Sequence, residues 1–317
     1  MNDYGTIGKV NKQNRRSRRL FVIKTKNWQL YLMLLPFLIY YILFYFRPMK
    51  GIAMAFQDFK PFLGIEGSKW VGLENFATFI NGPYFGRVVS NTLIINILNL
   101  LFGFPIPIIL AFLFNEIRNS RARTAFQTVS YIPYFISTVV VAGIIVNFLS
   151  PSSGIVNSII KQLGGEPIYF LVKPEWFRPI YILQGIWTGA GFGSIMYYSA
   201  LCSIDTSLYE AVAIDGGSRL KQLWHVALPG IRPTIAVMLI LQIGNLLNVG
   251  YEMIILLYEP ATYKTADVIS TYMYRVGMEN GNYSMSTAVG LINGVVSLIL
   301  VITANKISKK VNEVSII

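Results

Sequence analysis

The residues that could do chemistry in this chain are few, and their types exclude several classes of site. The single histidine, His225, and the single cysteine, Cys202, cannot form a metal centre of three or four ligands or a catalytic triad. One cysteine also allows no intrachain disulfide. The sequence has no G-x-x-x-x-G-K-[ST] motif for cradling nucleotide phosphates. We therefore predict no catalytic residue, no bound cofactor and no metal site in this chain.

Polar side chains gather instead in one apolar segment in the last third of the chain. At about 100° per residue, an α-helix would bring four of them onto an arc of about 120°. These four are Gln242, Asn245, Asn248 and Glu252, and Tyr251 would add an aromatic surface beside them. Amide and carboxylate groups suit sugar hydroxyls, which both donate and accept hydrogen bonds. We predict a substrate path along this face; the alternative is that the asparagines tie neighbouring helices together.

The composition indicates that this segment lies in a membrane. The chain is 54% hydrophobic and 13% charged, with a mean hydropathy of +0.51, whereas soluble domains are usually about 25% charged. Six charge-poor runs are long enough to cross a hydrocarbon core of about 30 Å. They lie at 28–46, 88–114, 126–149, 179–202, 235–258 and 285–305. We predict an all-α membrane protein with six transmembrane helices, in which Glu252 is the one charged residue.

Small and amide residues mark two of these runs. Gly185, Gly189 and Gly193 recur at every fourth position of the fourth run. Such spacing lets helices approach closely, so we predict helix packing there. In the second run, Asn91, Asn96 and Asn99 fit either a path or interhelical hydrogen bonds, and the sequence leaves both open.

The placement of positive charge orients the helices. The net charge is +12, and the basic residues concentrate in 1–27, in the loops after the second and fourth runs, and in 306–317. By the positive-inside rule both termini are cytoplasmic. The charge is thus explained by orientation, and we expect no nucleic-acid partner. The predicted organisation is a basic cytoplasmic tail (1–27), a transmembrane domain (28–305) and a cytoplasmic tail (306–317).

The predicted cytoplasmic loop 203–234 has the signals of two short helices. Ser207 and Glu210 have the spacing of a capping box, which predicts a helix start at that point. Gly216 and Gly217 can end this helix with a positive φ.

Ser218 can then cap a second helix, which we expect Pro229 and Pro233 to interrupt before the fifth run. The apolar stripe of this second helix consists of Leu220, Leu223, Trp224 and Ala227. A connector on the membrane surface and a docking element for a cytosolic partner both fit this pattern.

The same loop resembles the EAA motif of ABC importer permeases. The matching stretches are Glu210-Ala211-Val212, Asp215-Gly216 and Val226-Ala227-Leu228-Pro229. The loop departs from the motif at Val212 and Gly217, where alanine is usual, and at Val226 in place of isoleucine. Shorter stretches resemble the carbohydrate branch of these permeases: Val71-Gly72-Leu73-Glu74-Asn75-Phe76, Asn91-Thr92-Leu93 and Tyr131-Ile132-Pro133. Phe104-Pro105-Ile106-Pro107 and the basic N-terminus are similar to the oligosaccharide and polysaccharide subgroup.

The resemblance implies a fold, a place and a set of partners. The fold is that of a type I ABC importer permease, which forms half of a carbohydrate path in the bacterial cytoplasmic (inner) membrane. Its partners are a second permease subunit in a heterodimer, two ATPase subunits that hold ATP and Mg, and an extracytoplasmic solute-binding protein. The chain itself is then not an enzyme. Coupling to the ATPase falls on Ser207, Glu210, Ala211, Val212, Asp215, Gly216, Leu228 and Pro229.

One function of another class remains open from the residues alone. A secondary transporter or channel could use Glu252 to carry protons or bind a cation. Such a protein has no need of the Glu210–Pro229 loop, which therefore separates the two hypotheses.

Overall fold

A computed structural model describes residues 28–312, and the chain divides into two compact units, Met1–Lys50 and Gly51–Ile317. The predicted basic tail at 1–27 and the last residues, 313–317, lie outside the described residues. In the first unit, α1 (Trp28–Tyr41) passes directly into the π-helical segment η2 (Ile42–Phe46). The first predicted span, 28–46, is therefore helical throughout.

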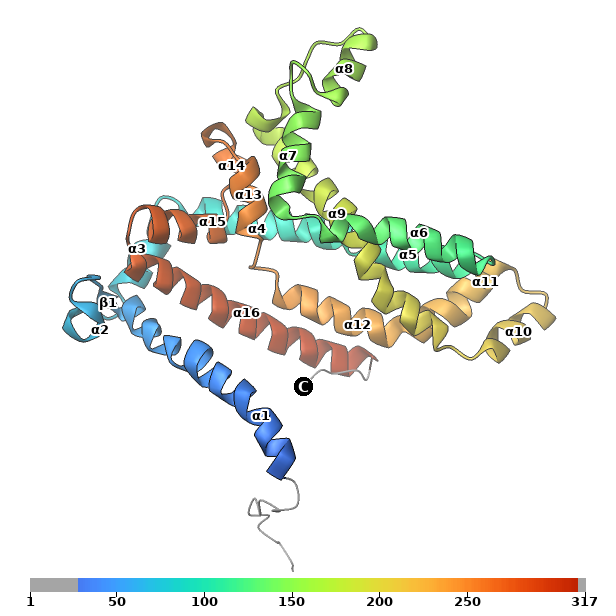
Figure 1. Cartoon of the computed structure of the whole chain (residues 1–317), viewed down its shortest axis with the longest axis horizontal. Helices are drawn as coiled ribbons and strands as arrows, with labels where there is room; N and C mark the ends of the chain where they lie inside the picture. Colours follow the sequence, from blue (N-terminus) through green and yellow to red (C-terminus); the bar gives the residue numbers. More distant parts are fainter. Residues whose placement is uncertain (1–27, 313–317) are drawn as a thin grey trace, which may run out of the picture. The chain divides into compact units, whose positions relative to one another are not determined.

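Over its described residues, 51–312, the second unit consists of helical segments, connecting loops and one short antiparallel pair, β1 (Gln57–Asp58) with β2 (Lys69–Trp70) (Figure 1). Its α-helices are α2 (Gly64–Gly67), α3 (Glu74–Ile80), α4 (Phe85–Leu98), α5 (Pro105–Glu116), α6 (Ser120–Tyr131), α7 (Thr138–Leu149), α8 (Ile155–Gln162), α9 (Pro174–Cys202), α10 (Thr206–Ile214), α11 (Arg219–Gln222), α12 (Leu228–Gly244), α13 (Tyr251–Leu257), α14 (Tyr263–Ala266), α15 (Ile269–Tyr274) and α16 (Tyr283–Asn312). The 3₁₀ and π segments are η3 (Pro48–Phe56), η4 (Asn99–Gly103), η5 (Ile132–Phe135), η6 (Phe170–Val172), η7 (Leu223–Ala227), η8 (Pro260–Thr262) and η9 (Arg275–Glu279). The prediction of an all-α protein is confirmed.

The number of apolar spans is lower than predicted. Among the described residues, four helices are long and apolar enough to cross a membrane, or five if one bent pair counts as a single span. The four are Trp28–Phe56, Phe85–Glu116, Arg219–Gly244 and Tyr283–Lys309. The predicted fourth span corresponds to α9, which has 29 residues but is not among them, because its glycines and polar residues dilute its apolar content.

The predicted third span, 126–149, is bent rather than straight. Ser120–Phe135 and Thr138–Leu149 meet at 96°. Pro133 lies in the 3₁₀ turn before the bend, where it has no N–H to donate. Ile136 is extended, and the Ser137 hydroxyl accepts a hydrogen bond from the Val140 N–H to start α7.

The predicted fifth span, 235–258, is broken, and the prediction of one continuous helix there is wrong. α12 ends at Gly244, and the Asn245 N–H closes it on the carbonyls of Leu241 and Gln242. Helix resumes only at Tyr251. Gly244 lies close to α16, because a Cβ at this position would meet the Val301 side chain.

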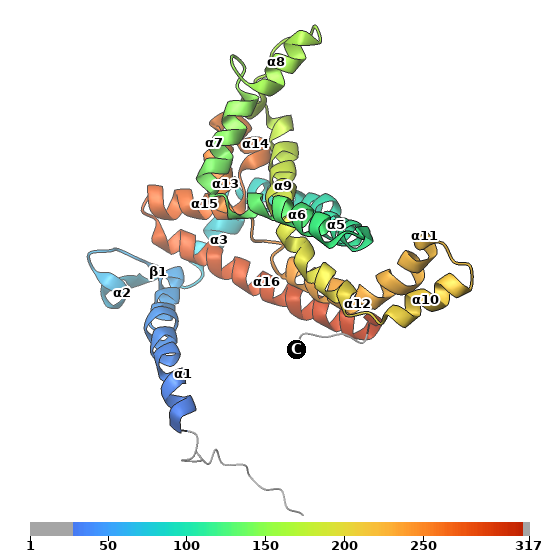
Figure 2. The ribbon, with the colours of Figure 1, turned by 45° about the vertical axis from the view of Figure 1, so that its right-hand side comes forward.

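Two pairs of long helices organise the second unit. α5 packs along α9, and α12 packs along α16 (Figures 1 and 2). Near the predicted cytoplasmic side, Ala111, Leu201 and Ile231 join α5, α9 and α12 in one buried cluster. At the other end of α9, Ile182 packs with residues of α4, α7 and α13. α9 is therefore anchored at both ends of the bundle.

Candidate functional sites

The predicted cytoplasmic loop is a compact helix pair with a different cap from the one predicted. α10 begins at Thr206, and its cap is Asp205, whose Oδ1 accepts a hydrogen bond from the Ser207 N–H at 2.9 Å. Hydrogen bonds from Ser207 lower the pKa of the Asp205 carboxyl. The predicted Ser207–Glu210 capping box is therefore wrong. The Asp205 carboxylate already occupies the capping position, and Glu210 is exposed.

The two glycines after α10 have different roles. Gly216 has a φ of +71°, which confirms the predicted helix end. Gly217 lies against α10, where its N–H donates to the Val212 carbonyl oxygen at 2.8 Å. A Cβ on Gly217 would meet both that oxygen and the Val212 side chain. The turn therefore needs glycine at both positions.

The second helix of the loop runs without interruption into the membrane. Ser218 caps α11 as predicted, with its hydroxyl accepting from the Lys221 N–H. α11, η7 and α12 then form one helix, Arg219–Gly244. The predicted interruption at Pro229 and Pro233 is wrong. The π turn η7 ends at Ala227, two residues before Pro229, so the helix is already widened at the point where Pro229 cannot donate a hydrogen bond.

The helix pair presents large apolar side chains to solvent. Trp224 and Leu220 from the predicted stripe are 58% and 66% exposed, while Ala227 is buried in the bundle. Leu208 and Ile214 of α10 are also exposed. A polar loop that leaves such residues uncovered is typical of a protein-binding surface.

The inner side of the helix pair encloses a cavity of about 390 Å³, which Thr206, Glu210 and Gln222 help to line. Glu116 at the end of α5 also lines it and forms an ion pair of 2.6 Å with Arg219 of α11. Gln222 also donates to the Tyr209 carbonyl oxygen, which ties the two helices of the pair together. These contacts join the loop to the end of α5.

The break after Gly244 scatters the residues of the predicted polar face. Asn245 caps α12 and donates to the Leu241 carbonyl oxygen, whereas the Asn248 amide oxygen accepts from Asn293 of α16 at 2.8 Å. The interhelical alternative thus holds for Asn248. Tyr251 stacks on Tyr274, with ring centroids 5.6 Å apart.

Glu252 also leaves the predicted face. It is exposed in the first turn of α13, a helix that is not among the candidate spans within 28–312. Glu252 is therefore separated by the break from Gln242, with which the sequence had grouped it.

Gln242 lines a different polar feature, a cavity of about 240 Å³ between α5, α9 and α12. Asn99 and Tyr197 also line it. Tyr197 is only 2% exposed, yet among residues 28–312 none forms a hydrogen bond with the side chain of Asn99, Tyr197 or Gln242. Three polar groups therefore face this cavity with their hydrogen-bonding capacity free.

Glycines make room for the cavity, which corrects the prediction that they serve close packing. A Cβ on Gly185 or Gly189 would meet no atom within 4 Å, and one on Gly193 would reach only Pro107 at 3.4 Å. Close packing of α9 occurs instead at Gly191, against the Ser130 carbonyl. On the opposite wall, Gly103 leaves space for the Asn99 amide, which a Cβ there would strike.

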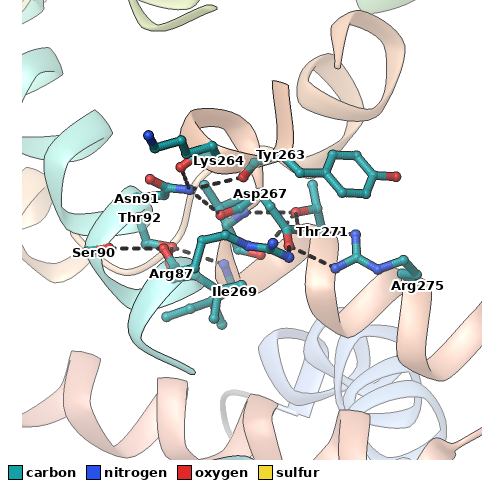
Figure 3. A network of polar contacts seen from close by, with 12 residues as sticks. Arg87, Ser90, Asn91, Thr92, Tyr263, Lys264, Asp267, Ile269, Thr271 and Arg275 are labelled. Carbon is teal, nitrogen blue, oxygen red and sulfur yellow. Dashed lines mark hydrogen bonds and ion pairs between the residues drawn. The ribbon is translucent and has the colours of Figure 1, made fainter. Parts of the chain in front are cut away.

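A buried charge network, which the sequence did not predict, lies at the predicted external ends of the helices (Figure 3). Asp267 is fully buried and accepts hydrogen bonds from Arg87 of α4 at 2.7 Å and from Arg275 at 2.8 Å. Burial acts to lower the pKa of Arg275, but its hydrogen bonds to Asp267 and the charge of that carboxylate raise it overall. Thr271 donates to the second carboxylate oxygen. The network clamps residues 263–275 onto α4.

Asn91 extends this network toward α9. Its amide nitrogen donates to the carbonyl oxygens of Asp267 at 2.9 Å and Lys264 at 3.1 Å. Its amide oxygen accepts from Arg178 at 2.8 Å. Asn91 therefore ties elements together, which resolves one of the two roles left open for the asparagines of the second run.

Comparisons with known proteins agree over most of the chain. Residues 103–313 match the family model of the binding-protein-dependent transport system inner membrane component. The polygalacturonan/rhamnogalacturonan transport system permease protein YteP of Bacillus subtilis is 45% identical, over 93% of this chain and 92% of that protein. Protein LplB of the same organism is 43% identical, over 92% and 91%.

A solved structure is also similar to this chain in sequence and fold. It is the crystal structure of a bacterial alginate ABC transporter in complex with alginate pentasaccharide-bound periplasmic protein, and one of its chains matches with a TM-score of 0.85 and 46% identity. The match covers 92% of this chain and 97% of that chain.

Proposed function

Since the chain belongs to the family of binding-protein-dependent transport system inner membrane components and is a permease of a carbohydrate ABC importer, we propose that it forms half of the path for an acidic oligosaccharide. YteP is a permease for polygalacturonan and rhamnogalacturonan, and alginate is an acidic polysaccharide. Polygalacturonan carries a carboxylate on each sugar. The relatives therefore support a uronate-containing substrate.

One observation carries the proposal: a single helix connects the polar cavity with the exposed apolar residues of the helix pair, Leu208, Ile214, Leu220 and Trp224. We call these four residues the docking surface. Trp224 is exposed near the start of the Arg219–Gly244 helix, and Gln242 lines the cavity near its end. At 1.5 Å per residue, the two positions are about 27 Å apart along the axis. A movement imposed on the loop would be transmitted along this helix to the cavity.

The docking surface is proposed to receive the ATPase subunit. α10 and the start of α11 would seat in that subunit through Leu208, Ile214, Leu220 and Trp224, with Glu210 and Asp215 at the rim. ATP and Mg would be held by the ATPase pair, so the energy would enter this chain only through the contact. The chain itself is proposed to catalyse no reaction.

The cavity is proposed as this chain's share of the substrate path. The Asn99 and Gln242 amides and the Tyr197 hydroxyl can donate to and accept from sugar hydroxyls. Gly185 and Gly189 of α9, which have no side chain, leave space for a sugar ring beside them. Of the residues predicted for substrate contact, Gln242 keeps that role, while Asn245, Asn248, Tyr251 and Glu252 do not face this cavity.

A chain that forms half of the path would need further partners. A second, similar permease subunit would complete the wall as a heterodimer, and an extracytoplasmic solute-binding protein would deliver the oligosaccharide. Both termini are proposed to lie in the cytoplasm, on the side of the docking surface.

The substitution Glu210→Lys tests the coupling assignment. Glu210 is exposed, so the change leaves the fold intact but puts a positive charge on the docking surface. In the full transporter we expect the ATPase subunits to copurify several-fold less and ATP-dependent uptake to fall with them. Glu175→Lys, at an exposed acid near the other end of α9, is the matched control and should assemble normally. Undisturbed assembly and uptake in the Glu210 variant would refute the assignment.

A further inference from the structure

Helix α5 lines both cavities, one at each of its ends. Gly103, just before α5, and Pro107, in its first turn, line the polar cavity. Phe112 and Glu116, near its other end, line the cavity of about 390 Å³ on the inner side of the helix pair. Pro107 and Glu116 are about 14 Å apart along the axis, at 1.5 Å per residue. α5 therefore runs between the polar cavity and the helix pair, as α12 does.

Buried packing between the two cavities joins α5 to α12. Ala111 of α5 and Ile231 of α12 are fully buried in one cluster. Tyr197 of α9 belongs to the same cluster and also lines the polar cavity. A close-packed core transmits a displacement because it has little free space in which to absorb one. A movement of α5 therefore reaches the walls of the polar cavity.

One ion pair links the helix pair to the end of α5. Arg219, the first residue of α11, lies 2.6 Å from Glu116, the last residue of α5, although the two are 103 positions apart in the sequence. The cavity of about 390 Å³ leaves the helix pair and α5 incompletely packed against each other at this point. Both side chains are exposed, so the pair adds little to the stability of the fold. Its position makes it a direct connection between the loop and α5.

The helix pair is built to move as a unit, whereas α5 has a place to bend. Gln222 of α11 donates to the Tyr209 carbonyl oxygen of α10, so a displacement of α10 is passed to α11. At the other end, the π turn η4 separates α5 from α4, and helices can bend at such a turn. α4 itself is held by the ion pair of Arg87 with Asp267. α5 can therefore shift about η4 while α4 stays fixed.

We propose that Arg219 and Glu116 couple α5 to the docking surface, so that a movement imposed by the ATPase subunit reaches both sides of the polar cavity. α12 carries the movement to Gln242, and α5 carries it to the wall at Gly103 and Pro107. Both charged residues are positioning residues, since they line the other cavity or its neighbourhood and act on the sugar only through α5. This inference rests on the proposed function and adds a second route for the same coupling.

The test exchanges the two charges in the transporter reconstituted with its ATPase subunits and binding protein. Glu116→Arg and Arg219→Glu each place like charges together, and the double variant restores the pair with its direction reversed. The measurement is the amount of trigalacturonate imported per ATP hydrolysed, beside copurification of the ATPase subunits and thermal unfolding. We expect each single variant to assemble and unfold normally but to import about three- to fivefold less sugar per ATP. The double variant should recover to within about twofold of the wild type. Arg118→Glu, at an exposed arginine just beyond α5, is the control and should leave the ratio unchanged.

Three results would overturn the inference. Normal import per ATP in both single variants would show that α5 needs no such link. Equal losses in the single and double variants would assign the effect to each residue by itself, as at a contact with the ATPase subunit. A lower unfolding temperature with normal import per ATP would make the pair purely structural. Absence of ATP-dependent import in the wild-type transporter would instead refute the proposed function, and the inference with it.

Discussion

Val212 and Gly217 are coupled departures from the EAA pattern, which has alanine at both positions. The structure gives the reason, since a Cβ on Gly217 would meet Cγ1 of Val212 and the Val212 carbonyl oxygen. The larger side chain at one position occupies the space that a methyl group at the other would need. The two residues therefore have to be considered as a pair.

We predict that Gly217→Ala alone destabilises the loop by about 1–3 kcal/mol through overpacking. Adding Val212→Ala should recover part of this loss, because the Cγ1 contact disappears while the carbonyl contact remains. Thermal unfolding of the purified transporter in a double-mutant cycle measures the coupling. Gly216→Ala is the control, since its positive φ makes it unfavourable whatever residue stands at 212. Additive effects of the two substitutions would contradict the prediction.

The pairing of individual charged residues was the feature that the sequence predicted least well. Asp267 stands in a predicted external loop, and nothing in its local pattern indicates that it is fully buried between Arg87 and Arg275. Its partners are up to 180 positions away in the sequence. In so apolar a chain, an acid close in sequence to an arginine is unusual and indicates an ion pair. It does not show which arginines pair with Asp267.

At the scale of elements, the sequence predicted where helices lie better than where they break. Apolar runs of about 20 residues are sufficient to locate α4–η4–α5 and α16. The break at 245–250 was marked by Gly244, Asn245 and Gly250, but in an apolar run these residues also fit a continuous helix. The π turn at Asn99–Gly103 has no comparable local mark. The polar face therefore failed as a prediction, because it assumed a constant helical repeat through Gly244.

Two glycines of α9 should respond in opposite ways to substitution. Gly189→Leu should fold, since a Cβ there meets nothing within 4 Å, but its side chain should fill the cavity and abolish substrate-stimulated ATP hydrolysis. Gly191→Ala, a much smaller change, should destabilise the protein, because its Cβ would strike the Ser130 carbonyl of α6. Thermal unfolding together with ATPase assays separates the two effects. An unfolded Gly189→Leu variant beside a stable Gly191→Ala variant would reverse the assignment of the two helix faces.

At the scale of the whole molecule, the net charge of +12 is divided between two kinds of region. Basic residues in the predicted cytoplasmic segments fit the positive-inside rule, and Arg219 and Lys221 begin the Arg219–Gly244 helix, which continues to the cavity. Arg87 and Arg275, in the predicted external part, are instead paired with the buried Asp267. Positive charge thus fits a role in orientation on one side of the membrane and ties helices together on the other.

The central claim is that the cavity lined by Asn99, Tyr197 and Gln242 senses substrate and reports it through α12 to the docking surface. Gln242→Leu in the reconstituted transporter tests this claim most directly, because it removes the amide at nearly constant side-chain size. ATP hydrolysis is measured with and without binding protein loaded with trigalacturonate. We predict normal assembly and basal hydrolysis, with substrate stimulation reduced about tenfold or more. Stimulation equal to that of the wild type would contradict the account and place the substrate path elsewhere.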